Sequence, residues 1–313
     1  MTWALAVHGG AGDIHADELG ADARAARHAG LQAALRAGAA VLRAGGAALD
    51  ATLAAVDVLE DDPVFNAGRG AVLDAAGRVR LDAAVMDGRD RACGAVGAVA
   101  GVRHAARLAA HVMQHTPHVL MVGAGARRIA RSAGLSRPAA AWFRTERRVA
   151  DLSKARAAGR VTLDHDGGGT VGAVARDAAG HLAAATSTGG MTAKWPGRVG
   201  DSPVIGAGTW ACDTTCAVSA TGHGERFIQA HVAGRIADLI ELAGLDVSAA
   251  AARVVHEELP RWQGKGGLIA VGRQGPPVLP FNTRGMLRGA CGDGFGAWSA
   301  LAGADTRRPC DEP

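Results

Sequence analysis

The chain has 313 residues, of which 48% are hydrophobic and only 4% aromatic, and its formal net charge is +4. This length allows a large core in one domain or two small ones. The basic residues are scattered, and the densest stretch, residues 144–148, is typical of a solvated helix face rather than a nucleic-acid site. No apolar run approaches the length that spans a membrane. We therefore expect neither a nucleic acid nor a membrane as partner.

The N-terminus and the cysteines indicate the compartment. Residues 1–7 lack the basic start of a secretory leader and predict a first strand that runs into a glycine turn. The five cysteines are odd in number and dispersed. Cys212 and Cys216 lie four positions apart, but no second Cys/His pair completes a zinc site. We expect free, buried thiols and a cytoplasmic protein.

The first half of the chain predicts helices followed by short strands. Alanine-rich stretches with apolar residues at helical spacing predict helices at 22–43 and 47–60, with a turn after them. Short alternating segments around 71–73 and 79–81 and at 95–99 indicate sheet, and helices are expected at 104–113 and 124–132. Residues 150–169 are polar and then glycine-rich, and we expect them to form a linker.

The second half begins a new sheet pattern. Residues 170–175 and 181–185 predict a hairpin, and further strands are expected at 204–206, 216–220, 268–271 and 278–279. Helices are expected at 225–243 and 248–259. Because helices and strands cluster rather than alternate, the pattern favours an α+β fold with antiparallel sheets covered by helices over a doubly wound fold. No complete dinucleotide-binding motif accompanies the glycine-rich turns.

The bond between Gly169 and Thr170 has the character of a cleavage site. Glycines at 167–169 lead into Thr170, which opens an apolar, strand-like run. A threonine hydroxyl is a weak nucleophile unless a base lies beside it. One solution is the threonine's own α-amine, which exists only after the preceding peptide bond has been broken.

Polar loops downstream of Thr170 supply the other parts of a site. Residues 186–190 bring hydroxyls and backbone amides after a strand, and residues 221–225 end another strand at a helix start, where free N–H groups favour negative charge. Arg198 and Asp201 share one glycine-bounded loop. They suit the α-carboxylate and α-ammonium of an amino acid, although a surface ion pair is an equal alternative for these two residues alone.

These segments together resemble the plant-type asparaginase/isoaspartyl peptidase family of N-terminal nucleophile hydrolases. The matching stretches follow the family's order from residue 8 to about residue 290. They are HGGAG (8–12), FNAG (65–68), LDAAVMDG (81–88), GTVGAVA (169–175), ATSTGGM (185–191), GRVGDSP (197–203), TGHGE (221–225) and LPFNT (279–283).

The resemblance implies a four-layer αββα sandwich, formed when one chain is cut into two interleaved subunits. The α subunit would be residues 1–169 and the β subunit 170–313, with two such pairs associating as (αβ)2. Self-cleavage would fall between Gly169 and Thr170.

The resemblance also implies roles for individual residues. Thr170 would be the nucleophile, tuned by Thr188, and Asn66 would support its amine. The Thr221 hydroxyl and the Gly222 N–H would form the oxyanion hole. The α-carboxylate and α-amine of the substrate would be held by Arg198 and Asp201, with Gly224 lining the pocket through its backbone. His223 is a candidate general base, but we expect a packed or rim residue there, because the α-amine already fills that role.

The implied reaction needs no cofactor for its chemistry. A structural sodium ion is expected on backbone carbonyls of the loop that contains Leu59, Glu60, Asp62, Phe65, Ala67 and Arg69. The expected substrates are small molecules, L-asparagine or β-aspartyl (isoaspartyl) dipeptides. Two alternatives are glycosylasparaginase activity and a non-catalytic relative that binds aspartate-like ligands.

Overall fold

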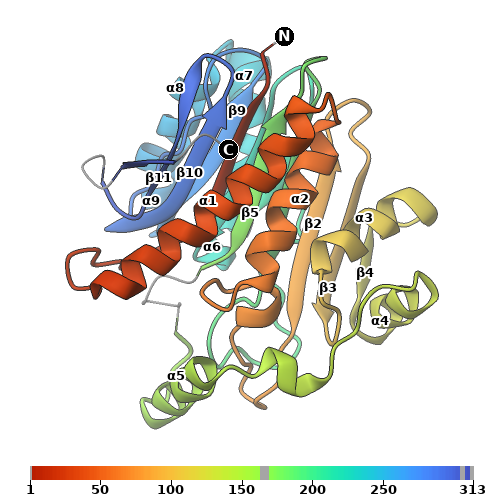
Figure 1. Cartoon of the computed structure of the whole chain (residues 1–313), viewed down its shortest axis with the longest axis vertical. Coiled ribbons are helices and arrows are strands. Elements are labelled where there is room, and N and C mark those ends of the chain that lie inside the picture. Colours follow the sequence, from red (N-terminus) through yellow and green to blue (C-terminus); the bar gives the residue numbers. More distant parts are fainter. Residues whose placement is uncertain (1, 163–168, 304–306, 311–313) are drawn as a thin grey trace.

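A large mixed β-sheet, a small sheet and helices on the outer sides of both make up the computed structural model, which describes residues 2–162, 169–303 and 307–310 (Figure 1). Within these ranges the large sheet has nine strands in the order β12-β11-β10-β1-β5-β6-β2-β3-β4. Neighbours are antiparallel except β3 and β4, which are parallel. The strands are β1 (Ala4–Gly12), β2 (Leu81–Asp87), β3 (Cys93–Val99), β4 (Leu120–Val122), β5 (Val171–Arg176), β6 (Leu182–Thr188), β10 (Gly285–Gly292), β11 (Phe295–Ala300) and β12 (Arg308–Pro309).

The small sheet lies against one face of the large sheet. Its antiparallel strands are β7 (Thr209–Ala211), β8 (Cys216–Gly222) and β9 (Gly266–Gly272). Side chains of both sheets meet in one apolar cluster that includes Val174 and Ala184 from the large sheet and Ala217 and Ile269 from the small one. Strands β5 and β6 are buried along their whole length, as expected for strands that are covered on both faces.

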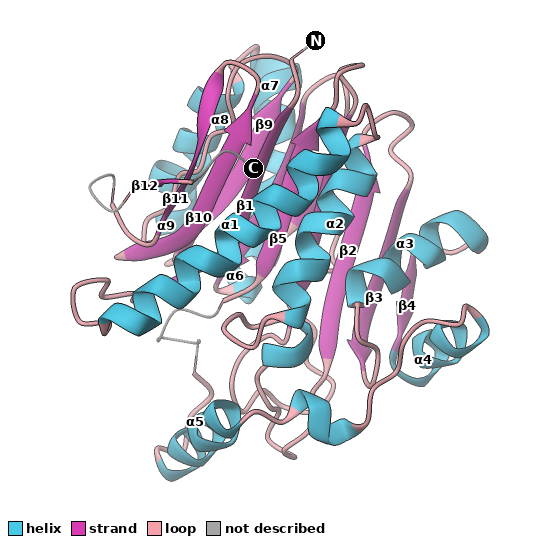
Figure 2. Ribbon diagram, in the orientation of Figure 1, coloured by secondary structure: helices cyan, strands magenta, loops and turns pink. Residues whose placement is uncertain are grey.

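Three helices cover the other face of the large sheet: α1 (Ala21–Arg43), α2 (Ala48–Asp61) and α3 (Ala105–His115) (Figure 2). Strand β1 shows how the alternation of side chains connects the layers. Leu5 and Val7 pack in the cluster under the helices, whereas Ala4 and Ala6 pack in the cluster between the sheets. Fully burying one leucine or valine contributes about 1.5–3 kcal/mol.

The outer face of the small sheet is covered by helices from the second half of the chain. These are α6 (Gly224–Ala230), α7 (Val232–Ala243), α8 (Val247–Arg253) and α9 (Leu259–Arg261), with a π-helical segment at Val254–Glu258. Helices α4 (Gly123–Ser132) and α5 (Glu146–Ala157) lie at the periphery, with α5 beyond the end of the large sheet (Figure 1). No helix of the described ranges is long and apolar enough to cross a membrane.

Several predicted elements differ from the structure. The helix expected at 225–243 is two helices, because His231 takes a left-handed conformation with a φ of 50°. The strands expected at 204–206 and 278–279 form only isolated bridges, Ile205 with Thr209 and Val278 with Ala270. The prediction of buried thiols holds only in part: none of the five cysteines, which lie in the described ranges, forms a disulfide, but only Cys216 and Cys291 are buried.

The linker prediction was wrong for its first part. Residues 150–157 belong to α5, whose N-terminus is capped by the side chain of Thr145. Thr162 then pairs with Thr192, and residues 163–168 lie outside the described ranges. The basic stretch at 144–148 is not a uniformly solvated face either. Arg148 is fully buried, and its Nε donates to the carbonyl of Gly70 at 2.6 Å.

Candidate active site

Strands β5 and β6 place two threonines side by side at the end of the large sheet. Val171 pairs with Ser187, so Thr170 and Thr188 lie at adjoining positions of the two strands. The Thr170 hydroxyl donates to the Thr188 hydroxyl at 3.1 Å, and the same Thr188 oxygen accepts from the Gly190 N–H at 2.9 Å. Both threonines are buried. The hydroxyl of Thr170 is therefore oriented by a neighbour that is itself held in place.

His8, on the adjacent strand β1, holds the backbone of Thr170. Its Nδ1 lies 2.9 Å from the Thr170 carbonyl oxygen, and its Nε2 lies 2.8 Å from the Ser219 hydroxyl. Because a carbonyl oxygen only accepts, Nδ1 carries the proton and Nε2 accepts from Ser219. Burial lowers the pKa of His8 to about 3, so the ring is neutral. His8 thus fixes the position of the Thr170 backbone.

Gly10 lies against the peptide that precedes Thr170. It has a φ of +118°, and a Cβ at this position would stand 2.2 Å from the Gly169 nitrogen. Only glycine fits both the conformation and the approach. The irregular part of β1, where its register with β10 shifts between His8 and Gly10, therefore lies directly against the Gly169–Thr170 bond.

The end of β8 brings a hydroxyl and a backbone amide to the same place. Thr221 is buried, and its hydroxyl oxygen accepts from the Ala11 N–H at 3.3 Å. A Cβ on Gly169 would lie 3.1 Å from this oxygen, so Thr221 is next to the bond before Thr170. Gly222 follows and lines the same pocket.

Arg198 and Asp201 lie on one side of this pocket, and Arg198 has a further partner. Its Nε and Nη2 donate to the two carboxylate oxygens of Glu225 at 2.9 and 3.0 Å. Asp201 is buried, and its Oδ2 has no hydrogen-bond partner in the described part of the chain. Burial raises the pKa of Asp201 to about 7, although the nearby Arg198 charge opposes the shift. A Cβ on Gly224 would lie 2.6 Å from Asp201 Oδ1, so a side chain there would close the site.

Asn66 lies at the pocket but bonds to backbone. Its Nδ2 donates to the Gly190 carbonyl at 2.7 Å, and its Oδ1 accepts from the Val72 N–H at 3.0 Å. In the uncut chain Asn66 therefore fixes the turn beside Thr188, and a bond to a Thr170 amine stays a prediction.

The structure brings most of the predicted catalytic and substrate-binding residues together around one small cavity of about 30 Å³, but Gly224 does not line it. A cavity of this size holds about one water molecule. With Gly169 still attached, little space remains for a substrate beside Thr170. The residues that line it and were predicted from the sequence are Asn66, Gly169, Thr170, Thr188, Arg198, Asp201, Thr221 and Gly222.

Two residues of the site were missed as functional candidates. His8 belongs to the HGGAG stretch and Glu225 to the TGHGE stretch, so both lay within segments already singled out. A histidine at the end of an apolar strand next to glycines was the available signal for His8. His223 lies next to Glu225, with Nε2 3.6 Å from Glu225 Oε2, but it does not line the cavity at Thr170, and its place at the rim stays a prediction.

The loop after α2 turns tightly, with Gly68 at a φ of +47°. A Cβ at Gly68 would stand 2.2 Å from the Glu60 carbonyl oxygen, and one at Gly70 would stand 2.0 Å from that of Phe65. The carbonyls of Asp62 and Ala67 accept from Phe65 and Gly70. Within the described residues, no group of three or more His, Cys, Asp or Glu side chains could hold a metal ion.

Known proteins of one family resemble this chain over nearly its whole length. The sequence profile of a family described as asparaginase matches residues 1–296. The chain belongs to this asparaginase family. The isoaspartyl peptidase of Salmonella typhimurium is 49% identical over 299 residues, which cover 92% of this chain and 96% of that protein. The isoaspartyl peptidase of Escherichia coli is 46% identical over 92% of this chain and 93% of its own length.

The family also reaches beyond these bacteria. The plant-type L-asparaginase of Pyrobaculum calidifontis is 43% identical over 290 residues, or 91% of this chain and 95% of that protein. As a member of the asparaginase family the chain is a hydrolase. The resemblance seen in the sequence segments is therefore confirmed across nearly the whole chain.

Proposed function

We propose that this hydrolase cleaves the side-chain amide of L-asparagine, the β-linked peptide of isoaspartyl dipeptides, or both. The observation that carries the proposal is the convergence of Thr170, Thr188 and Thr221 with Arg198 and Asp201 on one cavity. The names of the relatives support the same substrates. Both substrates offer a free α-amine, an α-carboxylate and a β-carbonyl, and they differ only in the leaving group.

The first stage is self-cleavage before Thr170. The Thr170 hydroxyl attacks the Gly169 carbonyl, the Gly169–Thr170 C–N bond breaks, and the nitrogen takes the proton as an ester forms. Water then hydrolyses that ester and leaves Thr170 with a free α-amine. Support comes from Gly10, which lies against this bond, and from His8, which holds the Thr170 carbonyl.

The second stage is hydrolysis of the substrate. An α-amine with a pKa of about 7.7–8 is partly neutral at pH 7 and takes the proton of the Thr170 hydroxyl. The hydroxyl oxygen attacks the β-carbonyl, and the oxyanion is stabilised by the Thr221 hydroxyl and the Gly222 N–H. Ammonia or an amino acid leaves with the proton. Water then hydrolyses the β-aspartyl ester on Thr170 and regenerates the amine and the hydroxyl.

The two charged ends of the substrate are expected to bind Arg198 and Asp201. An α-carboxylate replaces or joins Glu225 on the Arg198 guanidinium, which offers a bidentate fork. An α-ammonium binds the buried Asp201 carboxyl and favours its ionised form. The two anchors fix the position of the β-carbonyl relative to Thr170.

The assembly follows from the same resemblance. We infer a four-layer αββα sandwich, built from subunits 1–169 and 170–313, that associates as (αβ)2 in the cytoplasm. We also infer a structural sodium ion on the loop after α2. The close approach of Gly68 to the Glu60 carbonyl and of Gly70 to the Phe65 carbonyl makes this loop a tight turn with backbone oxygens, the ligand type that a hard cation prefers. The ion would be held by backbone carbonyls of Leu59, Glu60, Asp62, Phe65, Ala67 and Arg69.

A direct test compares substrates on fully matured protein. Ammonia release from L-asparagine and amino-acid release from several β-aspartyl dipeptides are measured in parallel. Turnover of either class supports the proposal. Absence of turnover of both by protein whose Thr170 is N-terminal would overturn it.

A further inference from the structure

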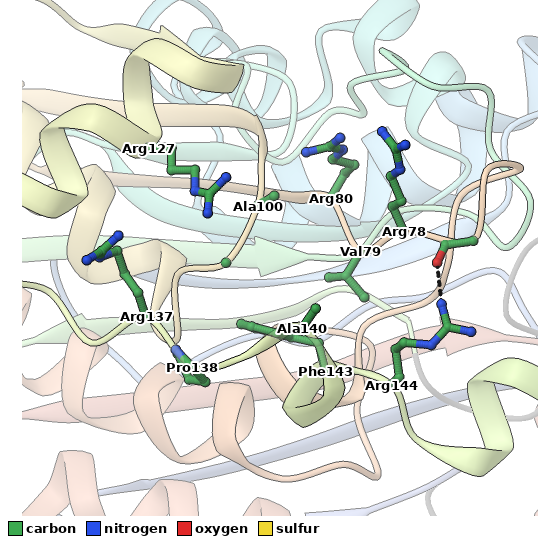
Figure 3. Close-up of a pocket in the computed structure, with 12 residues that line it drawn as sticks. Arg78, Val79, Arg80, Ala100, Arg127, Arg137, Pro138, Ala140, Phe143 and Arg144 are labelled. Atoms are coloured by element: carbon green, nitrogen blue, oxygen red, sulfur yellow. Dashed lines mark hydrogen bonds between the residues drawn. The ribbon is translucent and has the colours of Figure 1, made fainter.

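A second cavity, distinct from the one at Thr170, lies where the turn before β2 meets the segment between α4 and α5 (Figure 3). Its volume is about 430 Å³, which is within the range of small-molecule sites. It shares no lining residue with the cavity at Thr170. The reaction proposed above assigns it no role.

Five arginines line this cavity, and no acidic residue of the described chain does. Figure 3 shows Arg127 and Arg137 on one side and Arg78, Arg80 and Arg144 on the other. Four of the five are exposed and Arg80 is half-buried, so their guanidinium groups are open to an anion that arrives from solution. The cavity wall therefore has the electrostatic character of an anion site.

Three of these guanidinium groups have no acidic partner. Among the described residues, no ion pair involves Arg78, Arg127 or Arg137. Arg80 lies 4.0 Å from Asp74, and Arg144 donates to the Gly77 carbonyl at 2.7 Å. Most of the guanidinium N–H groups of these five arginines are therefore available to donate hydrogen bonds to a ligand.

The turn before β2, which carries Arg78 and Arg80, is held in place by hydrogen bonds to its backbone carbonyls. Arg156 donates to the Ala75 carbonyl at 2.8 Å, Arg144 to that of Gly77, and the buried Lys194 to that of Arg80 at 2.9 Å. A wall held in this way loses little conformational entropy when a ligand binds.

The remaining lining is apolar. Val79, Pro138 and Phe143 supply apolar side chains to the lining, and Val79 and Phe143 lie between the two groups of arginines in Figure 3. A guanidinium fork matches the oxygens of a phosphate, and a phosphate carries more charge for each group than a carboxylate. A ligand with phosphates and a ring would use both kinds of lining. We propose that this cavity binds a small organic phosphate, such as a nucleoside diphosphate.

Calorimetric titration of the wild-type protein at low salt tests the ligand class. ADP is expected to bind, pyrophosphate to bind more weakly, and adenosine not to bind. Absence of ADP binding at millimolar concentration would overturn the proposal. Binding of citrate as tight as that of ADP would contradict the preference for phosphate.

Paired variants test the location. Arg127→Ala with Arg137→Ala should weaken ADP binding at least ~10-fold, since two charge-assisted contacts are lost. The control is Arg128→Ala with Arg131→Ala, which removes the same charge from exposed residues of α4 that do not line the cavity. The control should bind ADP as the wild type does. Equal weakening in both pairs would show a diffuse charge effect and would refute the site. Hydrolysis of asparagine is measured separately, so failure of ADP binding would not contradict the proposed hydrolase function.

Discussion

Nδ1 of His8 lies 2.9 Å from the carbonyl oxygen of Thr170, although the two residues are 162 positions apart. The contact joins the first strand of the chain to the residue that immediately precedes β5. The neutral ring donates to Thr170 on one side and accepts from Ser219 of β8 on the other. One side chain thus links both sheets at the site.

The depressed pKa of His8 predicts a specific acid sensitivity. His8 binds a proton below pH 6.5 when unfolded, but only near pH 3 when folded, so its contribution to stability is lost as the pH falls from 6.5. Between pH 6.5 and 5 this loss is about 2 kcal/mol. His8→Gln should remove that part of the pH dependence. Urea unfolding at the two pH values, in the single-chain Thr170→Ala background, measures it. Equal pH dependence with and without the histidine would contradict the account.

Gly10→Ala should block self-cleavage. Its methyl group would collide with the backbone of Gly169, and the residue would be strained at a φ of +118°. A denaturing gel should show the uncut chain. The control is Gly20→Ala, where a Cβ meets nothing within 4 Å, and this variant should mature normally. Normal maturation of Gly10→Ala would show that Gly10 does not position the Gly169–Thr170 bond.

Arg198→Lys should raise the KM for asparagine by about 10–100-fold, because an ammonium cannot replace a bidentate fork. Maturation should continue, since Arg198 contacts Glu225 rather than Gly169. Arg226→Lys is the matched control, because the Arg226 side chain donates to the Gln229 side chain and does not line the pocket. Steady-state kinetics at several substrate concentrations separates KM from kcat. An unchanged KM for Arg198→Lys would remove Arg198 from the carboxylate site.

The raised pKa of Asp201 predicts that substrate binding depends on pH. Its folded pKa is raised to about 7, so it becomes protonated as the pH falls below 7 and loses attraction for an α-ammonium. KM should therefore rise about tenfold for each pH unit below 7. Asp201→Asn should have a high KM that no longer follows this profile. A wild-type profile that persists in the variant would assign the titration to another group.

Much of the fold could be predicted from local patterns. The helical spacing at 22–43 and 47–60 and the glycine-containing turn between β5 and β6 identified α1, α2 and the central hairpin. Strands β10 and β11 were missed because GMLRGACG and FGAWSA show no clear alternation. The break at His231 depends on one left-handed residue, which local spacing does not reveal.

The site could be predicted to a similar extent. The residue types and their order identified Thr170, Thr188, Thr221, Arg198 and Asp201, which the structure brings to one cavity. The pairing of Arg198 with Glu225 and the contact of His8 with Thr170 depend on how distant loops meet in space. Such distances follow from packing of the two sheets and not from any single segment.

The central claim is that an exposed α-amine on Thr170 activates its own hydroxyl. The most direct measurement is N-terminal sequencing and intact-mass analysis of a preparation with asparaginase or isoaspartyl peptidase activity. The account predicts a second N-terminus that reads Thr-Val-Gly-Ala, and neither this terminus nor activity in Thr170→Ala. Full activity in protein that begins only at the N-terminus of the uncut chain would contradict it.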